Sequence, residues 1–313
     1  MLMISAEDLH RGLDFPSLID AIDSQFHDGC TVPVRHHHTI ETPDGLDPTL
    51  LLMPAWAQGD VIGVKIVTVF PENGKKNLPA VMGAYMLMDG TSGAPLAMID
   101  GAALTARKTA CVSALASRYL SRPDSSTLLM VGTGVLAPHL IRAHATVRPI
   151  SDVMIWGRNR DKSEALATTF DGEDYRVRAV DDLKQAVAKA DVISCATLAQ
   201  QPLIEGDWLL AGQHLDLVGS FTPTMREADD VCVKRSKVYC DSRDGAMKEA
   251  GDLLQPITNG TLRVEDVIGD LFDMARGTCA LRESATDITF FKSAGSALED
   301  LAAAKLAFAR ANG

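Results

Sequence analysis

The segment LLMVGTGVLAPH, residues 128–139, constrains the fold more than any other part of the chain. An apolar run leads into Gly132, Gly134 and Ala137, spaced as G-x-G-x-x-A, and a helical pattern begins directly after them. At such a strand–turn–helix junction the first glycine permits a tight turn, the second lets the backbone approach a pyrophosphate, and the small third residue lets the helix pack on the strand. The segment predicts a dinucleotide-binding unit, with a glycine-rich turn of another α/β fold as the alternative.

The pattern on both sides of this turn alternates between strands and helices. Helical spacing covers 136–147, 161–170 and 181–189, and apolar strand-like runs occupy 128–132, 152–157, 177–180, 191–196 and 214–219. Alternation of this kind is typical of βαβ units. The fold class expected here is α/β, with a doubly wound parallel sheet of the Rossmann type.

The N-terminal region has a different rhythm. Helical spacing over 6–25, in which Pro16 begins a second helix, is followed by strand-like segments without intervening helices, at 32–41, 49–57, 61–70 and 81–89. This order predicts a mostly antiparallel α+β domain. A long helix is expected over 102–120, and a second over 297–311, whose domain the pattern leaves open.

Composition excludes several classes of function. The formal charge of −11 argues against a nucleic-acid partner, because phosphate binding needs clustered cations. No signal segment or membrane span is apparent, so we expect a cytoplasmic protein without a membrane partner. The six cysteines are scattered, and neighbours in the histidine triplet 36–38 point to opposite faces of a strand. We therefore expect free thiols and no metal.

The end of the second strand of the α/β domain indicates which dinucleotide binds. An acidic residue there would bind the ribose 2′-hydroxyl of NAD, but this chain has Gly157-Arg158-Asn159-Arg160. Two guanidinium groups suit a 2′-phosphate, which favours NADPH, with NADH retained as a second cofactor. The alternative is that Arg158 and Arg160 are solvated loop charges.

Two cations interrupt apolar strands in the N-terminal region. Arg35 and Lys65 each have hydrophobic neighbours, and burying such a cation is costly unless it meets an anion. The anion is either a substrate carboxylate or an internal Asp or Glu. Arg107 and Lys108 near the start of the long helix point about 100° apart, so we expect only one of them to face a cleft.

Seven segments together resemble the ornithine cyclodeaminase/mu-crystallin family, over nearly the whole chain. They are VPVR at 32–35, GVKIVTVFPEN at 63–73, LTARKTA at 104–110, VGTG at 131–134, GSFTPTMRE at 219–227, YCDSRDGAMKEAGDL at 239–253 and ITFFKSAGSALEDLAAAKL at 288–306. The resemblance implies a Rossmann domain, residues 119–292, inserted into a substrate-binding and dimerisation domain, residues 1–118 and 293–313. It also implies a homodimer joined through the substrate domains.

The resemblance further implies the site residues. Arg35 and Lys65 fall where the family binds the substrate carboxylate, and Lys108 falls on the arginine of L-T-A-x-R-T. Lysine keeps the charge of that arginine but not its bidentate fork. The implied cofactor-binding residues are Gly132, Thr133, Gly134, Val135, Ala137, Arg158, Asn159, Arg160, Thr197 and Ser293.

Phe221 separates subclasses within the family. Cyclodeaminases of the family carry an aspartate at this position of the turn, whereas this chain has GSFTPTMRE. Without that carboxylate, the turn offers no general base for loss of ammonia. A reductase needs a cationic anchor and correct orientation, because the cofactor supplies the difficult chemistry. Phe221 is then expected to form an apolar wall beside the nicotinamide or the substrate ring.

The expected function is therefore that of an NAD(P)H-dependent oxidoreductase, a ketimine reductase. It would reduce 1-pyrroline-2-carboxylate to L-proline, and the six-membered analogue to L-pipecolate, with a small cyclic imino acid as substrate. Proton delivery is assigned to Lys65, Glu249, Asp252 or an ordered water. Ornithine cyclodeaminase activity, alanine dehydrogenase activity and a non-catalytic small-molecule binding role remain alternatives.

Overall fold

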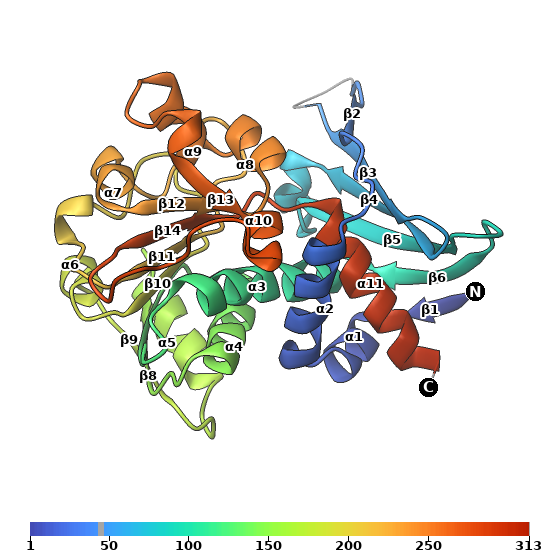
Figure 1. Ribbon diagram of the computed structural model, residues 1–313. Coiled ribbons are helices and arrows are strands. Elements are labelled where there is room, and N and C mark those ends of the chain that lie inside the picture. The colour runs from blue at the N-terminus through green and yellow to red at the C-terminus, as the bar shows by residue number, and fades with distance from the viewer. Residues whose placement is uncertain (43–46, 313) are drawn as a thin grey trace. The chain divides into compact units, whose positions relative to one another are not determined.

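The computed structural model describes residues 1–42 and 47–312 (Figure 1). It divides into two compact units, which we describe separately. The first unit comprises Met1–Lys108 and Ser296–Gly313, and the second comprises Thr109–Gly295. The division falls inside the long helix α3, Gly101–Leu120, as does the boundary that we expected after residue 118.

A six-stranded sheet forms the centre of the first unit, in the order β1-β6-β5-β4-β3-β2. The strands are β1 Leu2–Ile4, β2 His36–Thr39, β3 Thr49–Ala57, β4 Val61–Val69, β5 Val81–Asp89 and β6 Pro95–Asp100. All neighbours pair antiparallel except β1 and β6, which confirms a mostly antiparallel sheet. The register places Lys65 in β4 between Met53 in β3 and Tyr85 in β5.

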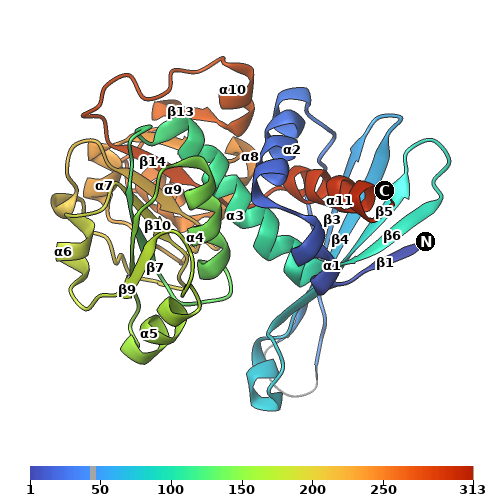
Figure 2. The same ribbon diagram turned by 90° about the horizontal axis from the view of Figure 1, so that it is seen from below.

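Helix α11, Ala297–Asn312, lies on one face of this sheet, and α1 Ala6–Gly12 and α2 Phe15–Asp28 pack against α11. The 3-10 helix η1, Pro71–Lys76, connects β4 and β5, and α3 begins directly after β6. As expected, Pro16 stands at the beginning of a second helix, which Asp14 caps. Helix α11 packs against α2 and against β3 and β4 (Figure 2). The C-terminal helix therefore belongs to the first unit.

The second unit is built on an eight-stranded parallel sheet, in the order β13-β12-β14-β11-β10-β7-β8-β9. Its strands are β7 Thr127–Val131, β8 Asp152–Trp156, β9 Arg176–Ala179, β10 Val192–Cys195, β11 His214–Leu217, β12 Lys237–Cys240, β13 Val267–Asp270 and β14 Thr289–Lys292. Every neighbouring pair is parallel. The structure confirms the predicted α/β fold class with a doubly wound sheet.

Helices cover both faces of the parallel sheet. They are α4 Ala137–Val147, α5 Arg160–Thr168, α6 Leu183–Val187, α7 Asp230–Arg235, α8 Arg243–Glu249, α9 Gly251–Thr258 and α10 Leu271–Arg276, with 3-10 helices η2 Gly206–Trp208 and η3 Val264–Asp266. In Figure 1, α4 and α5 lie below the sheet and α7 and α9 above it. Apolar side chains of β7, β10, β11 and β14 pack with those of α6 to α9 in one buried core.

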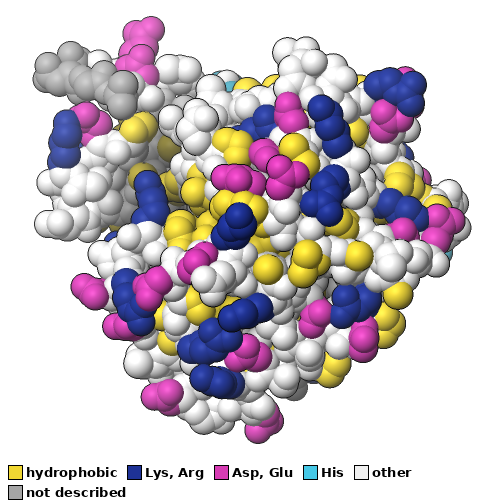
Figure 3. All heavy atoms as spheres, turned by 90° about the vertical axis from the view of Figure 1, so that its left-hand side faces the viewer, with side chains coloured by type: hydrophobic (Ala, Val, Ile, Leu, Met, Phe, Trp, Pro, Cys, Tyr) yellow, Lys and Arg dark blue, Asp and Glu magenta, His cyan; other side chains and the backbone are white. Residues whose placement is uncertain are grey.

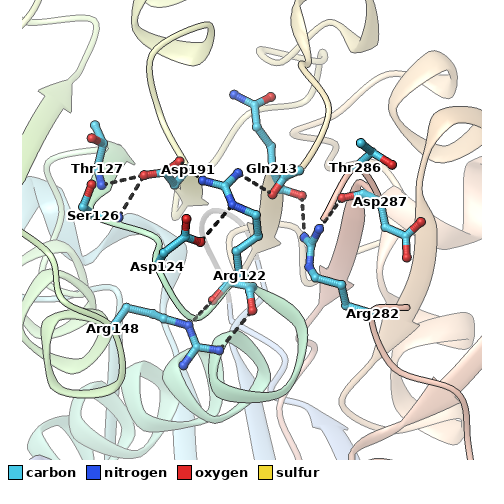
Figure 4. A network of polar contacts seen from close by, with 12 residues as sticks. Arg122, Asp124, Ser126, Thr127, Arg148, Asp191, Gln213, Arg282, Thr286 and Asp287 are labelled. Atoms are coloured by element: carbon cyan, nitrogen blue, oxygen red, sulfur yellow. Dashed lines mark hydrogen bonds and ion pairs between the residues drawn. The ribbon is translucent and has the colours of Figure 1, made fainter. Parts of the chain in front are cut away.

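A polar network joins the amino ends of four of these parallel strands (Figure 4). Asp191, before β10, accepts hydrogen bonds from Arg122 Nη2 at 2.6 Å and from the backbone N–H of Thr127 at 3.0 Å. Arg282 donates to the backbone oxygen of Gln213 at 3.1 Å, before β11, and to Thr289 Oγ1 at 3.1 Å, in β14. These residues fix the end of the sheet opposite to that at which parallel α/β sheets bind ligands.

Candidate functional site

The turn after β7 has the backbone that a dinucleotide turn requires. Gly132 has φ of +121°, and a Cβ atom there would lie 2.6 Å from the backbone oxygen of Ala196, so only glycine fits. At Gly134 an added Cβ would meet no atom within 4 Å, which leaves that backbone open to a ligand. Ala137 is buried where α4 begins. These features leave the backbone of the turn accessible, and the roles of the three small residues in cofactor binding stay a prediction.

The first turn of α4 is suited to an anion. Its N-cap residue, Leu136, forms no side-chain cap, whereas Asn159, Asp182 and Asp229 cap helices α5, α6 and α7. Helix N-termini carry backbone N–H groups without partners inside the helix, and these groups bind phosphates. Val135, which precedes the cap, is 78 % exposed. The residues of this turn therefore fit the pyrophosphate of a dinucleotide.

The two arginines of the loop after β8 differ in their ion pairs. Arg160 forms ion pairs with Glu164, at 2.7 Å, and with Asp181. Asn159 caps α5 by accepting a hydrogen bond from the N–H of Lys162 at 3.1 Å. Arg158 is exposed, and within residues 1–42 and 47–312 no carboxylate forms an ion pair with it. Arg158 is accordingly the cation of this loop that is available to a 2′-phosphate.

Thr197 is held in place by a carboxylate that the sequence analysis did not single out. Glu227 Oε1 accepts hydrogen bonds from the backbone N–H of Thr197 at 2.7 Å and from its hydroxyl at 2.8 Å. Glu227 Oε2 accepts one from the backbone N–H of Gly219 at 2.7 Å. The carboxylate thus joins the segments that follow β10 and β11. Thr197 also lies beside the dinucleotide turn, because a Cβ atom at Gly132 would lie 3.4 Å from Thr197 Cγ2.

Glu227 lies in a buried group with Asp252 and Lys292, which we name the Glu227 cluster. Asp252 Oδ1 accepts hydrogen bonds from the backbone N–H groups of Glu227 at 2.8 Å and Ala228 at 3.1 Å. Lys292 donates to the backbone oxygen of Leu217 at 3.1 Å and lies 3.6 Å from Asp252 Oδ2. Burial raises the pKa of Glu227 to about 7, against the opposing charge of Lys292. Asp252 thus holds the backbone at Glu227 and Ala228 in place.

Three other predicted residues of the second unit have distinct surroundings. Ser293 follows β14 and donates its hydroxyl to Asp241 Oδ2 at 3.1 Å, an oxygen that also accepts from the N–H of Gly295 at 2.6 Å. Glu249, the last residue of α8, is partly exposed. Phe221 is 52 % exposed, in the irregular segment after β11. Asp241, which orients Ser293, was not anticipated, although it lies within the segment YCDSRDGAMKEAGDL.

The first unit contains a second buried charge cluster, formed by Lys65, Lys108, Glu299 and Asp300, which we name the lysine–carboxylate cluster. Lys65, 6 % exposed, places Nζ 2.7 Å from Asp300 Oδ2. Lys108, 2 % exposed, places Nζ 2.6 Å from Glu299 Oε2 and 3.9 Å from Asp300 Oδ1. The sequence left open whether Lys65 meets an internal Asp or Glu, and the structure supplies such a partner in Asp300.

Arg107 and Lys108 do point in different directions, as their helical spacing predicts. The Arg107 guanidinium lies 4.3 Å from the centroid of the Phe15 ring and donates to the backbone oxygen of His10 at 2.9 Å. Only Lys108 reaches the lysine–carboxylate cluster. Arg35 lies in the segment just before β2, partly buried, and its charge contributes to the electrostatics of Asp300.

The pKa values in this cluster follow from burial and opposite charges. Burial raises the pKa of Asp300, but Lys108, Lys65 and Arg35 outweigh it and leave that pKa below its ordinary value. Burial lowers the pKa of Lys65, and Asp300 opposes this change. Burial also raises the pKa of Tyr85 well above its ordinary value, so the phenol stays neutral.

Other features of the described chain bear on the classes of site that were considered. Strand β2, which carries the histidine triplet, is exposed at the edge of its sheet, and His36 and His38 meet edge to face at 6.3 Å between ring centroids. Within the described ranges no group of three His, Cys, Asp or Glu side chains suits a metal ion. Nor is any helix in those ranges long and apolar enough to cross a membrane. Basic and acidic side chains intermingle on the face drawn in Figure 3.

Comparison with known proteins decides the family. A model of the ornithine cyclodeaminase/mu-crystallin family matches residues 2–313. The chain belongs to this family. A family relative, the Δ1-pyrroline-2-carboxylate reductase of Colwellia psychrerythraea, is 39 % identical over 309 residues, which cover 97 % of each chain.

Two solved structures extend the family comparison. The Δ1-pyrroline-2-carboxylate reductase of Thermococcus litoralis, in complex with NADH and L-proline, superposes with a TM-score of 0.93 at 31 % identity, over 100 % of this chain and 98 % of that one. An archaeal alanine dehydrogenase dimer with bound NAD gives a TM-score of 0.90 at 25 % identity, over 100 % and 96 %. Relatives named as reductases confirm the predicted enzyme class, an NAD(P)H-dependent oxidoreductase of this family.

Proposed function

We propose that this protein reduces a cyclic ketimine carboxylate with NAD(P)H, and that 1-pyrroline-2-carboxylate, which yields L-proline, is its main substrate. The observation that carries the proposal is a group of cations in the first unit. The charges of Arg35, Lys65 and Lys108 all act on Asp300, and both lysines are buried. Cations gathered in this way suit a substrate that carries a carboxylate.

The chain's own residues have separate roles in this reaction. Arg35, Lys65 and Lys108 bind and orient the substrate carboxylate, and the turn at Gly132 and Gly134 with the first turn of α4 binds the pyrophosphate. The bound dinucleotide supplies the hydride that the imine carbon accepts. The imine nitrogen must also gain a proton.

We assign delivery of this proton to Lys65, with Glu249 as the second candidate. Asp252 is unsuited to that role, because one of its oxygens accepts two backbone hydrogen bonds and the residue is buried beside Lys292. Phe221 offers an apolar surface where the family's cyclodeaminases carry a carboxylate. This substitution supports reduction over cyclodeamination.

A panel of substrates tests the proposal. The protein is assayed in the reductive direction with 1-pyrroline-2-carboxylate, 1-piperideine-2-carboxylate, or pyruvate plus ammonia, each with NADPH and with NADH. We expect the highest kcat/KM with 1-pyrroline-2-carboxylate and NADPH. Turnover of pyruvate plus ammonia alone would indicate an alanine dehydrogenase, and tight dinucleotide binding without any turnover would indicate a binding protein. Formation of proline and ammonia from ornithine would overturn the subclass.

We also propose that the protein is a homodimer joined through the first unit. Alternate residues of β3, β4, β5 and β6 face away from the lysine–carboxylate cluster, because side chains alternate across a strand. Most of those residues are apolar and at least partly exposed: Leu52, Pro54, Trp56, Ile62, Val64, Ile66, Ala84, Met86, Met88 and Met98. A continuous apolar sheet face of this kind suits a second copy of the same face, related by a two-fold axis.

Replacement of Ile66 tests the dimer. Ile66→Glu places a charge within the apolar face and should convert the dimer to monomers in sedimentation velocity. Leu210→Glu is the matched control, because Leu210 is an exposed leucine of the second unit. A monomeric wild-type protein, or a dimer that Ile66→Glu leaves intact, would contradict this interface.

A further inference from the structure

The C-terminal helix places two consecutive acids in the interior of the first unit. Glu299 and Asp300, in the first turn of α11, are both fully buried. Acidic side chains are seldom buried unless they are paired, because removing a carboxylate from water is costly. Each of them has a lysine partner from a distant part of the chain, Lys108 in α3 and Lys65 in β4. Helix α11 thus supplies the carboxylates of the cluster, and β4 and α3 supply its lysines.

Asp300 holds the central place in this cluster. Its Oδ2 lies 2.7 Å from Lys65 Nζ and its Oδ1 lies 3.9 Å from Lys108 Nζ, and Arg35 also contributes to lowering its pKa. All three cations that we assign to the substrate carboxylate therefore act on Asp300. Although its oxygens are buried, neither accepts a well-directed hydrogen bond from a described residue. Asp300 is engaged through charge.

We propose that Asp300 is a positioning residue for substrate binding, which holds Lys65 as an ammonium group and aims it at the substrate carboxylate. This inference rests on the proposed function, because it takes Lys65 to be a ligand of that carboxylate. Nothing in the sequence segments around Arg35, Lys65 or Lys108 assigns such a role to the C-terminal helix.

The surroundings of Lys65 explain why it needs Asp300. Burial and the neighbouring Lys108 both lower the pKa of Lys65, and Asp300, followed by Glu299, opposes them. The neutral phenol of Tyr85 lies on the neighbouring strand and supplies no charge. Without the Asp300 carboxylate, Lys65 would lose its proton at a lower pH. The substrate carboxylate would then lose one of its cations.

The test is a pH profile of Asp300→Asn, which preserves shape and removes the charge. We expect the alkaline limb of kcat/KM to move down by about one pH unit, and KM for the imine to rise about tenfold above that limb. Asp300→Asn on a Lys65→Arg background should not move the limb, because arginine does not titrate in this range. A limb that stays in place in Asp300→Asn would overturn the inference.

Two controls separate positioning from structural support. Leu298→Ala removes a buried side chain of the same helix outside the cluster and should lower the melting temperature without moving the limb. If Asp300→Asn does not fold, Asp300→Glu keeps the charge but displaces the carboxylate by one methylene. That variant should keep the wild-type limb and raise KM, and an unchanged KM would contradict the inference.

A binding measurement distinguishes this inference from the proposed function. Pyrrole-2-carboxylate, a planar ring carboxylate that cannot turn over, is titrated calorimetrically into wild-type protein and Asp300→Asn on both sides of the limb. Weaker binding by the variant only at the higher pH supports the inference. Equal affinities of the two proteins at both pH values would refute it alone. A wild-type protein that neither binds this probe nor reduces an imine would refute the proposed function instead.

Discussion

The two buried charge clusters of this protein use similar residues for different purposes. In the Glu227 cluster, the carboxylate oxygens accept hydrogen bonds from backbone N–H groups, so the charges hold loops together. In the lysine–carboxylate cluster, the two carboxylates meet lysine side chains, and Arg35 adds a further positive charge. Carboxylates that accept backbone hydrogen bonds therefore support the fold, whereas carboxylates that pair with lysine side chains hold cations that can also bind an anionic ligand.

The largest effect is expected when a lysine of the lysine–carboxylate cluster is replaced. Lys65→Met should lower kcat/KM for 1-pyrroline-2-carboxylate about a thousandfold, because orientation of the carboxylate and its charge partner are lost together. The dissociation constant for the dinucleotide, measured by nicotinamide fluorescence, should stay unchanged. A variant that retains wild-type kcat/KM would show that the lysine–carboxylate cluster does not bind the substrate.

A smaller effect is expected when the Glu227 cluster is disrupted. Glu227→Ala leaves the N–H groups of Thr197 and Gly219 without their acceptor and should lower the free energy of unfolding by about 3 kcal/mol. Chemical denaturation measures this change, and the dissociation constant for the dinucleotide should rise with it. The exposed Glu205 provides the matched control, since Glu205→Gln should alter neither quantity.

The pH dependence of stability sharpens the same contrast. The pKa of Glu227 is raised from 4.5 to about 7 in the folded protein, so the folded state binds more protons than the unfolded state between these values. Linkage then requires this residue's contribution to the free energy of unfolding to fall as the pH rises from 4.5 towards 7. Urea denaturation across that range should show a steeper fall for the wild type than for Glu227→Gln, and equal slopes would contradict the assignment.

The same distinction applies to the two arginines after β8. Arg160 already has two carboxylate partners and Arg158 has none among the described residues. Arg158→Ala should therefore raise KM for NADPH about tenfold and leave KM for NADH nearly unchanged, while Arg160→Ala should have a smaller effect. Equal effects of Arg158→Ala on both cofactors would remove the case for a 2′-phosphate contact.

The smallest effect is expected at Arg107, the neighbour of Lys108 in α3. Its guanidinium packs over the ring of Phe15, outside both clusters. Arg107→Ala should lower the free energy of unfolding by about 1 kcal/mol, through loss of this cation–π contact, and should leave KM for the imine unchanged. A rise in KM equal to that of a Lys108→Ala variant would show that charge near α3, rather than membership of the cluster, controls binding.

Local patterns predicted much of the fold. The apolar strand, the glycine spacing and the helix at residues 128–147 are set by chain geometry within a few residues, and the structure has β7, a left-handed Gly132 and α4 there. Short strands were missed, among them β1 with three residues and β14 with four, because so few residues carry little periodicity. Strand β2 was expected over 32–41 but covers only His36–Thr39.

Local sequence therefore predicts the chemistry that is available: a dinucleotide turn, three cations that could bind a carboxylate, and a phenylalanine where cyclodeaminases of the family carry an acid. Tertiary structure alone decided which charges meet. Lys108 and Glu299 are separated by 191 positions, and no periodicity within either segment encodes their contact at 2.6 Å. Pairing over such a separation depends on how sheet and helix pack, because burial makes each buried charge require a partner. That packing, rather than any local motif, placed Asp300 among the three cations.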